Sequence, residues 1–356
     1  MKKWMSGLAA GLLLISILAG CGKTSDASSE PESSGSAVLT LPSGDETSQT
    51  QPSPSSENLN PLTGENDLTT GGTRPVGIMI GNNSTSRPQF GIDKADMYVE
   101  AETEGGITRI LALFANAERI PAQLGPVRSA RSPFVTIARA MDIIYAHAGG
   151  STPALETLKK IKMDNINALS YDGTTFWRDK QVWKDKGQEY SMMISGEKMK
   201  ARIDKLKMST TGTRPAPFSF GKKTGSGAGN SLQVNVSDSR AVTFIYDSAS
   251  GLYTKGNGKI GDTTVHKAAD GTPIKVANVL VLYADKVMEN ALTCDFKLGS
   301  GSGLLLTGGT SRTIQYACSA DKFTLQEEDG SLLEVTPGKT YICLVNTKLK
   351  GKTVVA

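Results

Sequence analysis

Two arginines three residues apart, Arg128 and Arg131, lie in the stretch "LGPVRSARSPF", between a Gly-Pro turn and the start of an expected helix at Pro133. A helix N-terminus presents free N–H groups and a positive potential, so cations are disfavoured there unless an anion lies with them. Guanidinium groups and N–H donors together bind phosphate or carboxylate groups. The pattern favours an anion site. The alternative is that both arginines pair with Glu100 or Glu102 and brace the fold.

A second glycine turn is expected to complete this site. The segment Gly149-Gly150-Ser151-Thr152 follows an apolar strand at 143–148 and precedes a second helix, which begins at Pro153. Its free N–H groups would point to the same anion. His147 lies at the end of the strand, where α/β sheets place their sites, so it is a candidate general base or ligand contact. A histidine hydrogen-bonded to a neighbouring loop is an equally open interpretation.

Three glutamates precede a Gly-Gly turn that should join strands 95–104 and 109–114 as a hairpin. If the turn is tight, Glu102 lies opposite Arg109. Alternation along the strand then places all three glutamates on one face, namely Glu100, Glu102 and Glu104. They could hold a cation, but a solvated face neutralised by Arg109 is the favoured interpretation.

Several kinds of chemistry lack their sequence signals. The chain has only two histidines, in separate regions, and no His/Cys/carboxylate cluster at zinc-ligand spacing. It has no Gly-x-Ser-x-Gly motif of a nucleophile elbow. The glycine-rich stretch from Gly221 lacks the residue order of a phosphate-binding loop and is expected to be a linker. No cofactor is therefore expected.

The periodic patterns divide the folded part into two domains. Residues 73–205 alternate apolar strands, glycine turns and capped helices, which predicts an α/β domain with a mixed sheet. Residues 206–230 are rich in Thr, Pro, Gly, Ser and Lys and are expected to form a linker. Residues 231–356 contain strands and turns, which predicts a mainly antiparallel β domain. Its three cysteines are expected at buried strand positions, with one disulfide left open: Cys294, Cys318 and Cys343.

The N-terminus has the pattern of a bacterial lipoprotein signal. Residues 1–20 combine two lysines, a short apolar run and the sequence Leu-Ala-Gly before Cys21, the expected lipidation site. Residues 21–72 have no aromatic residue and are expected to be a lipidated, disordered tether. The chain is therefore expected to be extracytoplasmic, anchored to the cell membrane by N-terminal lipid.

Charge is distributed unevenly along the chain. Residues 23–72 contain one lysine and eight acidic residues, a net charge of −7, whereas residues 73–356 contain 36 Lys and Arg against 27 Asp and Glu, a net charge of +9. A basic folded part outside the cell favours anionic envelope ligands, such as phosphate-bearing polymers or lipid head groups. A nucleic-acid partner is not expected, and protein partners are left open.

Several motifs resemble the YerB-like family of bacterial lipoproteins. They are "NPLTGE", "RPVGIMIGNN", "RPQFGIDKADMYVEAETEGGITRILALF", "GPVRSARS", "YAHAGG" and "FWRD", followed by "YDSASGLYTK" and "TPGKTYICLVN". The likeness runs from about Asn60 to the C-terminus. It implies a two-domain architecture and a surface location, and it implies no particular reaction.

The first domain is also weakly similar to the LytR-CpsA-Psr glycopolymer transferases, in its order of strands, arginine loop and Gly-Gly turn. These surface enzymes use arginines and aspartates around a lipid-linked pyrophosphate and a divalent cation. The matching positions are Arg87, Asp96, Arg109, Arg128 and Arg131. The leading expectation is a binding or accessory module for an anionic envelope ligand. The alternative is a phosphotransferase-type enzyme acting on phosphate-bearing lipid or glycan, with a divalent cation.

Overall fold

The computed structural model describes residues 58–68 and 73–356. The expected signal peptide, the lipidation site Cys21 and most of the expected tether lie outside these residues. None of the helices in the described part is long and apolar enough to cross a membrane.

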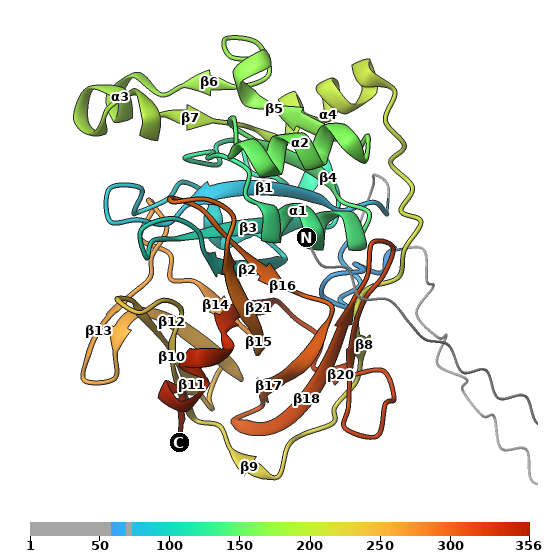
Figure 1. The fold of residues 1–356 in the computed structure, drawn as a ribbon, viewed down its shortest axis with the longest axis vertical. Coiled ribbons are helices and arrows are strands. Elements are labelled where there is room, and N and C mark those ends of the chain that lie inside the picture. Colours follow the sequence, from blue (N-terminus) through green and yellow to red (C-terminus); the bar gives the residue numbers. More distant parts are fainter. Residues whose placement is uncertain (1–57, 69–72) are drawn as a thin grey trace, which may run out of the picture. The chain divides into compact units, whose positions relative to one another are not determined.

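Twelve strands of the described residues form one main sheet. Figure 1 labels many of them, among them β1, β2, β3 and β21. From one edge to the other its path runs β19 (Phe323–Gln326), β18 (Thr310–Cys318), β17 (Ser300–Thr307), β15 (Asn278–Met288), β21 (Thr340–Asn346), β2 (Met97–Glu102), β3 (Thr108–Phe114), β1 (Val76–Gly81), β4 (Ile144–His147) and β5 (Asn165–Asn167). Two further strands pair off this path, β16 (Cys294–Lys297) with β15 and β9 (Gly227–Ala228) with β18.

The main sheet is mixed. Strand β21 is parallel to both of its neighbours, β15 and β2, and strands β1, β4 and β5 are parallel to one another. The other pairs of this sheet are antiparallel. The expectation of a mixed α/β sheet followed by a mainly antiparallel region is confirmed.

A second sheet contains β13 (Asp262–Val265), β12 (Leu252–Lys259), β11 (Ala241–Asp247), β10 (Ser231–Asn235) and β22 (Val354–Val355), with β14 (Lys275–Val276) paired to β12. Two small ribbons join β20 (Glu334–Val335) to β8 (Ser219–Phe220), and β6 (Trp177–Arg178) to β7 (Met192–Met193). The helices are α1 (Ser132–Ala140), α2 (Thr152–Lys160), α3 (Lys180–Lys186) and α4 (Gly196–Leu206).

Each face of the main sheet buries its own apolar cluster, because side chains alternate along every strand. One face packs on α1 and on the residue that follows it, through buried side chains: Phe134, Ile137, Ala138 and Met141. The other face packs on the second sheet through residues such as Val234 and Phe244, and on α4 through Ile203. Strands predicted from alternation are therefore covered on both sides.

The expected tether is shorter than the composition indicated. Residues 58–68 fold onto the domain, with Leu62 only 1% exposed and part of an apolar cluster. The carbonyl of Thr63 accepts a hydrogen bond from the N–H of Gly338, and Asp67 forms an ion pair with Arg119. One buried leucine and a few specific bonds hold a segment whose average composition is polar.

The expected linker is also tied to the fold. Phe218 is buried, and the following β8 and β9 pair with strands near the end of the chain. The parts before 206 and after 230 meet again where β2 pairs with β21. Cys294, Cys318 and Cys343 are buried in strands, as predicted, and all three are free thiols.

Candidate functional site

The guanidinium of Arg131 is paired with an acidic residue of the protein itself. Its guanidinium donates to both carboxylate oxygens of Glu104, at 2.7 and 2.8 Å, and the same carboxylate pairs with Arg109. Both arginines are less than 9% exposed. Burial, followed by the nearby Arg131, lowers the pKa of Arg109 to about 10. Arg131 therefore braces the fold by pairing with a glutamate, as the alternative interpretation expected, but the partner is Glu104 and not Glu100 or Glu102.

A β-bulge places Glu104 there. Glu102 lies opposite Thr108, and the N–H of Ile107 donates to the carbonyl of Glu104, which leaves Thr103 as an extra residue in its strand. An extra residue reverses the alternation of side chains beyond it. The expectations that Glu102 lies opposite Arg109 and that all three glutamates share one solvated face are therefore wrong. Each glutamate has its own cationic partner: Glu100 with Lys255, Glu102 with Lys286, and Glu104 with two arginines.

Arg128 is also paired. Its guanidinium binds the carboxylate and the backbone carbonyl of Glu189, and it lies 5.0 Å from the ring centroid of Tyr190. The predicted neighbourhood is nevertheless present, because the backbone N–H of Ala130 donates to the carbonyl of Gly149 and Ala130 forms a bridge with Gly150. The loop and the glycine turn adjoin, but the arginines are not free for an anion.

His147 is a buried histidine hydrogen-bonded to neighbouring residues, as in one of its two interpretations. It is 1% exposed, and its ring nitrogens contact the carbonyl of Gly149 at 2.7 Å and the side-chain oxygen of Asn165 at 3.2 Å. Burial lowers its pKa, although both contacts oppose that shift. The histidine orders the turn at the end of β4.

The remaining predicted residues do not join this region. Asp96 is fully buried and accepts hydrogen bonds from the guanidinium of Arg119 and from the N–H of Ala115. Arg87 contacts two amide-type oxygens, the carbonyl of Asn82 and the side chain of Asn257, each at 3.2 Å. Asp96 and Arg87 therefore lie in polar clusters of their own.

A closed ring of buried polar side chains connects the two halves of the chain. Glu100 Oε2 lies 3.5 Å from Lys255 Nζ, and Lys255 Nζ lies 3.1 Å from His266 Nδ1. His266 Nε2 lies 2.8 Å from the side-chain oxygen of Gln89, whose amide nitrogen donates to Asn82. Asn82 closes the ring by donating to Glu100 Oε1 at 2.8 Å. We call these five residues the buried ring.

The protonation states in the buried ring follow from donors and acceptors. An ammonium group can only donate, so Nδ1 of His266 accepts from Lys255 and Nε2 carries the proton given to Gln89. Burial and the neighbouring Lys255 lower the pKa of His266 well below its usual value. Burial alone would raise the pKa of Glu100, but Lys255 and a hydrogen bond from Tyr341 outweigh it, and the pKa is lowered.

A polar cavity of about 280 Å³ lies against the buried ring. Its lining comes from both halves of the chain, and we call it the seam cavity: Asn82, Arg87, Glu100, Thr108, Val236, Ser239, Arg240, Ala241, Val242, Asn257, Gly258 and Thr264. Asn82 directly follows β1, so the cavity lies at the carboxyl end of that strand. This is the edge where open α/β sheets bind ligands.

The seam cavity has an excess of positive charge. Among the described residues, neither Arg87 nor Arg240 has a carboxylate within ion-pair distance, whereas the charge of Glu100 is matched by Lys255. Burial lowers the pKa of Arg87, and Glu100 partly opposes that shift. Two guanidiniums thus line one small polar cavity, which is the arrangement expected for binding an anion.

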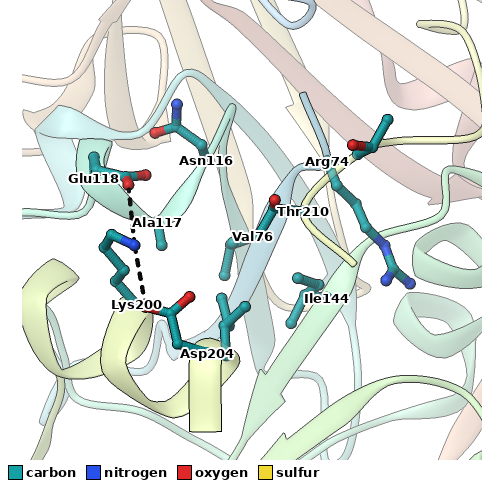
Figure 2. A pocket seen from close by; sticks show the side chains of 11 residues that line it. Arg74, Val76, Asn116, Ala117, Glu118, Ile144, Lys200, Asp204 and Thr210 are labelled. Atoms are coloured by element: carbon teal, nitrogen blue, oxygen red, sulfur yellow. Dashed lines mark hydrogen bonds and ion pairs between the residues drawn. The ribbon is translucent and has the colours of Figure 1, made fainter. Parts of the chain in front are cut away.

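A second cavity, of about 330 Å³, lies at the opposite ends of the parallel strands (Figure 2). Val76 and Ile144, the first residues of β1 and β4, form part of its floor. Its position is not the usual ligand edge of an α/β sheet. No group of three or more potential metal ligands occurs in the described part of the chain.

Arg87 is a predicted site residue that lines the seam cavity, whereas no sequence pattern indicated Arg240 or the buried ring. A lysine in an alternating strand is ordinarily solvated, so the position of Lys255 gave no signal. His266 was noted only as one of two separated histidines. Lys255 and His266 lie eleven residues apart, but their partners in the first half of the chain, Glu100 and Gln89, lie more than 150 residues away, and no local spacing indicates such contacts.

Comparison with known proteins agrees with this architecture. The family model described as the N-terminal domain of a protein of unknown function, DUF3048, matches residues 62–209, and the corresponding C-terminal domain model matches residues 232–342. The chain is 30% identical over 282 residues to YerB of Bacillus subtilis (strain 168), which is named as a candidate lipoprotein; the match covers 76% of this chain and 81% of that protein. The chain therefore belongs to the YerB-like family.

A solved structure supports the same assignment. The crystal structure of the YerB protein from Bacillus subtilis matches with a TM-score of 0.72 at 27% identity, over 83% of this chain and 98% of that one. The two matched regions correspond to the α/β part and the mainly β part, and the seam cavity has residues from each.

Proposed function

We propose that this protein is a lipid-anchored, extracytoplasmic binding module for an anionic, phosphate-bearing ligand of the cell envelope. The signal pattern before Cys21 and the name of the Bacillus subtilis relative support the anchor. The positive charge of residues 73–356 supports an anionic ligand.

One observation determines where we place the ligand. Arg87 and Arg240 line the seam cavity without carboxylate partners among the described residues, whereas Arg128 and Arg131 are neutralised by Glu189 and Glu104. The side chains of Ser239, Asn257 and Thr264 add polar groups to the same cavity. The proposed anion site therefore contains Arg87 and Arg240, and it does not include Arg128 and Arg131.

Titration of the detergent-solubilised full-length protein with inorganic phosphate, pyrophosphate and glycerol phosphate tests this assignment. Each charge-assisted arginine contact is worth about 1.5 kcal/mol or more, so Arg87→Ala with Arg240→Ala should weaken binding about 100-fold. Arg128→Ala is the matched control and should leave the affinity unchanged. Equal losses in both variants, or a parent protein that ignores all three anions, would contradict the site.

The anchor is tested separately. Cys21→Ala should leave the protein unlipidated, so it should be released from membranes or remain uncleaved. Processing and membrane retention like those of the parent protein would exclude Cys21 as the anchor. Turnover of a pyrophosphate-linked lipid by the parent protein, with or without a divalent cation, would favour the enzyme alternative.

A further inference from the structure

The parallel strands of the α/β part begin at one edge of the main sheet, which we call the amino edge. Val76, Ile144 and Asn165 are the first residues of β1, β4 and β5. Helix α2 follows β4 and precedes β5, so it runs back to this edge, and α1 precedes β4 and ends there as well. The last turns of both helices carry cations, as the helix dipole favours.

Three cavities adjoin one another along the amino edge. One, shown in Figure 2, lies at the first residues of β1 and β4 and is lined by Lys200 of α4. It shares Arg74 with a cavity that also contains Lys162, which follows α2. It shares Glu118 with a cavity that also contains Lys94, which precedes β2. The amino edge is therefore one continuous surface from the end of α2 to the start of β2.

The unpaired charge of the amino edge is positive. Each of the six carboxylates that line the three cavities forms an ion pair with an arginine or a lysine: Asp67, Glu118, Asp142, Asp164, Asp204 and Asp321. Five exposed lysines at the ends of α2 and α4 have no carboxylate within ion-pair distance in the part of the chain that the structure describes: Lys159, Lys160, Lys162, Lys205 and Lys207. Such a group of exposed cations attracts an anionic surface.

The chain that leads to the proposed lipid anchor enters the fold at the same edge. In the segment 58–68, the carbonyl of Thr63 accepts a hydrogen bond from the N–H of Gly338, two residues before β21 begins. Asp67 of this segment pairs with Arg119, which follows β3. Strand β21 begins and β3 ends at the amino edge, because β21 is parallel to β2 and β3 is antiparallel to β1. The anchor therefore joins the fold on the side that carries the unpaired lysines.

We propose that the amino edge docks on an anionic membrane surface, with the lysines of α2 and α4 against the lipid head groups. The proposal rests on the lipid anchor proposed above and does not depend on the seam cavity. A lipid attaches the chain at one point and leaves the orientation of the domain free, whereas a basic surface adds a second attachment. The seam cavity lies at the other end of β1, about 20 Å away for a strand of six residues. Docking therefore directs the seam cavity away from the membrane, towards envelope polymers.

Lysine acylation of the full-length lipidated protein, reconstituted in vesicles and measured by mass spectrometry at trace reagent, tests the proposal. Lys159, Lys160 and Lys205 should react about tenfold more slowly in vesicles of phosphatidylcholine with phosphatidylglycerol than in phosphatidylcholine alone, because docking covers them. The difference should disappear at about 1 M salt, where charges are screened beyond about 3 Å. Lys184 and Lys259, which are also exposed but lie near the seam cavity, should react alike in both kinds of vesicle.

Lys160→Gln with Lys205→Gln removes two of the five lysines and should shift the docking equilibrium about 25-fold towards the free orientation, because each lysine contributes about fivefold near an anionic surface. Lys184→Gln with Lys259→Gln is the control variant with the same loss of charge and should leave the protection of Lys159 unchanged. Equal acylation of Lys159 in both kinds of vesicle would overturn the proposal. Stronger protection of Lys184 and Lys259 would also overturn it, because the lipid would then lie at the seam cavity.

Flotation with phosphatidylcholine vesicles tests the anchor separately. Failure of the parent protein to float contradicts the anchor itself. Flotation without protection of Lys159 in the anionic vesicles contradicts only the docking surface.

Discussion

Lys255→Met should be one of the most destabilising single substitutions on the buried ring. Lys255 is fully buried and 3.5 Å from Glu100, which is 1% exposed. Removing one partner of a buried ion pair leaves an uncompensated charge and costs about 3–5 kcal/mol. Nδ1 of His266 also loses its donor, and the side-chain oxygen of Asn257 keeps only the one from Arg87.

Urea denaturation followed by tryptophan fluorescence at pH 7.5 measures this cost. The double variant Lys255→Met/Glu100→Gln removes both charges, so its loss of stability should be smaller than the sum of the two single losses. Without Lys255, burial should raise the pKa of Glu100 above its unfolded value, so the Lys255→Met deficit should shrink as the pH falls towards 5. Additive losses, or a deficit of less than about 1 kcal/mol with no pH dependence, would refute the reasoning.

Three further predictions concern stability. Because the pKa of His266 is lowered in the folded state, the unfolded state binds a proton more readily. The free energy of unfolding should therefore be highest above about pH 6.5 and should decrease as the pH falls below that value. His266→Gln should reduce this pH dependence in urea titrations from about pH 5 to 8. Glu104→Gln removes the carboxylate that pairs with Arg109 and Arg131. It should lower the free energy of unfolding by about 2 kcal/mol, less than for a fully buried pair because Glu104 is partly exposed. An unchanged urea midpoint would show that Glu104 does not stabilise the two arginines. Leu62→Ala should lower the free energy of unfolding by about 2–3 kcal/mol, because Leu62 is packed against the domain. A melting temperature equal to that of the parent protein would show that residues 58–68 belong to the tether, as the composition indicated.

Local patterns were enough to predict β2, β3, β4, α1 and α2, because alternation, turn residues and helical periodicity depend on neighbours in sequence. The bulge at Thr103 could not be predicted in this way. It is fixed by pairing across the hairpin, and a single extra residue moved Glu104 to the opposite face and to Arg131. Proximity of the arginine loop to the glycine turn was correctly inferred, but the partners of each guanidinium were not.

The buried ring could not be predicted from the sequence for a different reason, because its contacts join residues that are distant along the chain. Gln89 and His266 are separated by 177 positions, and only the packing of the second sheet on the main sheet brings them within 2.8 Å. Composition was misleading at residues 58–68 for a related reason. The average polarity of that segment is high, yet a single leucine with a matching apolar surface is enough to fix it.

The central position of β21 has a consequence for how the chain is made and folded. This strand comes almost at the end of the sequence, yet it lies between β2 and β15 and hydrogen-bonds to both. During synthesis, one edge of β2 must therefore remain unpaired until some 240 later residues have been made, as the register of Tyr98 with Tyr341 requires. Unpaired strand edges promote association with other chains, so early termination before β21 should yield aggregates rather than a folded first domain. We therefore expect the two family regions, although successive in sequence, to complete their folding together, only after β21 has been made.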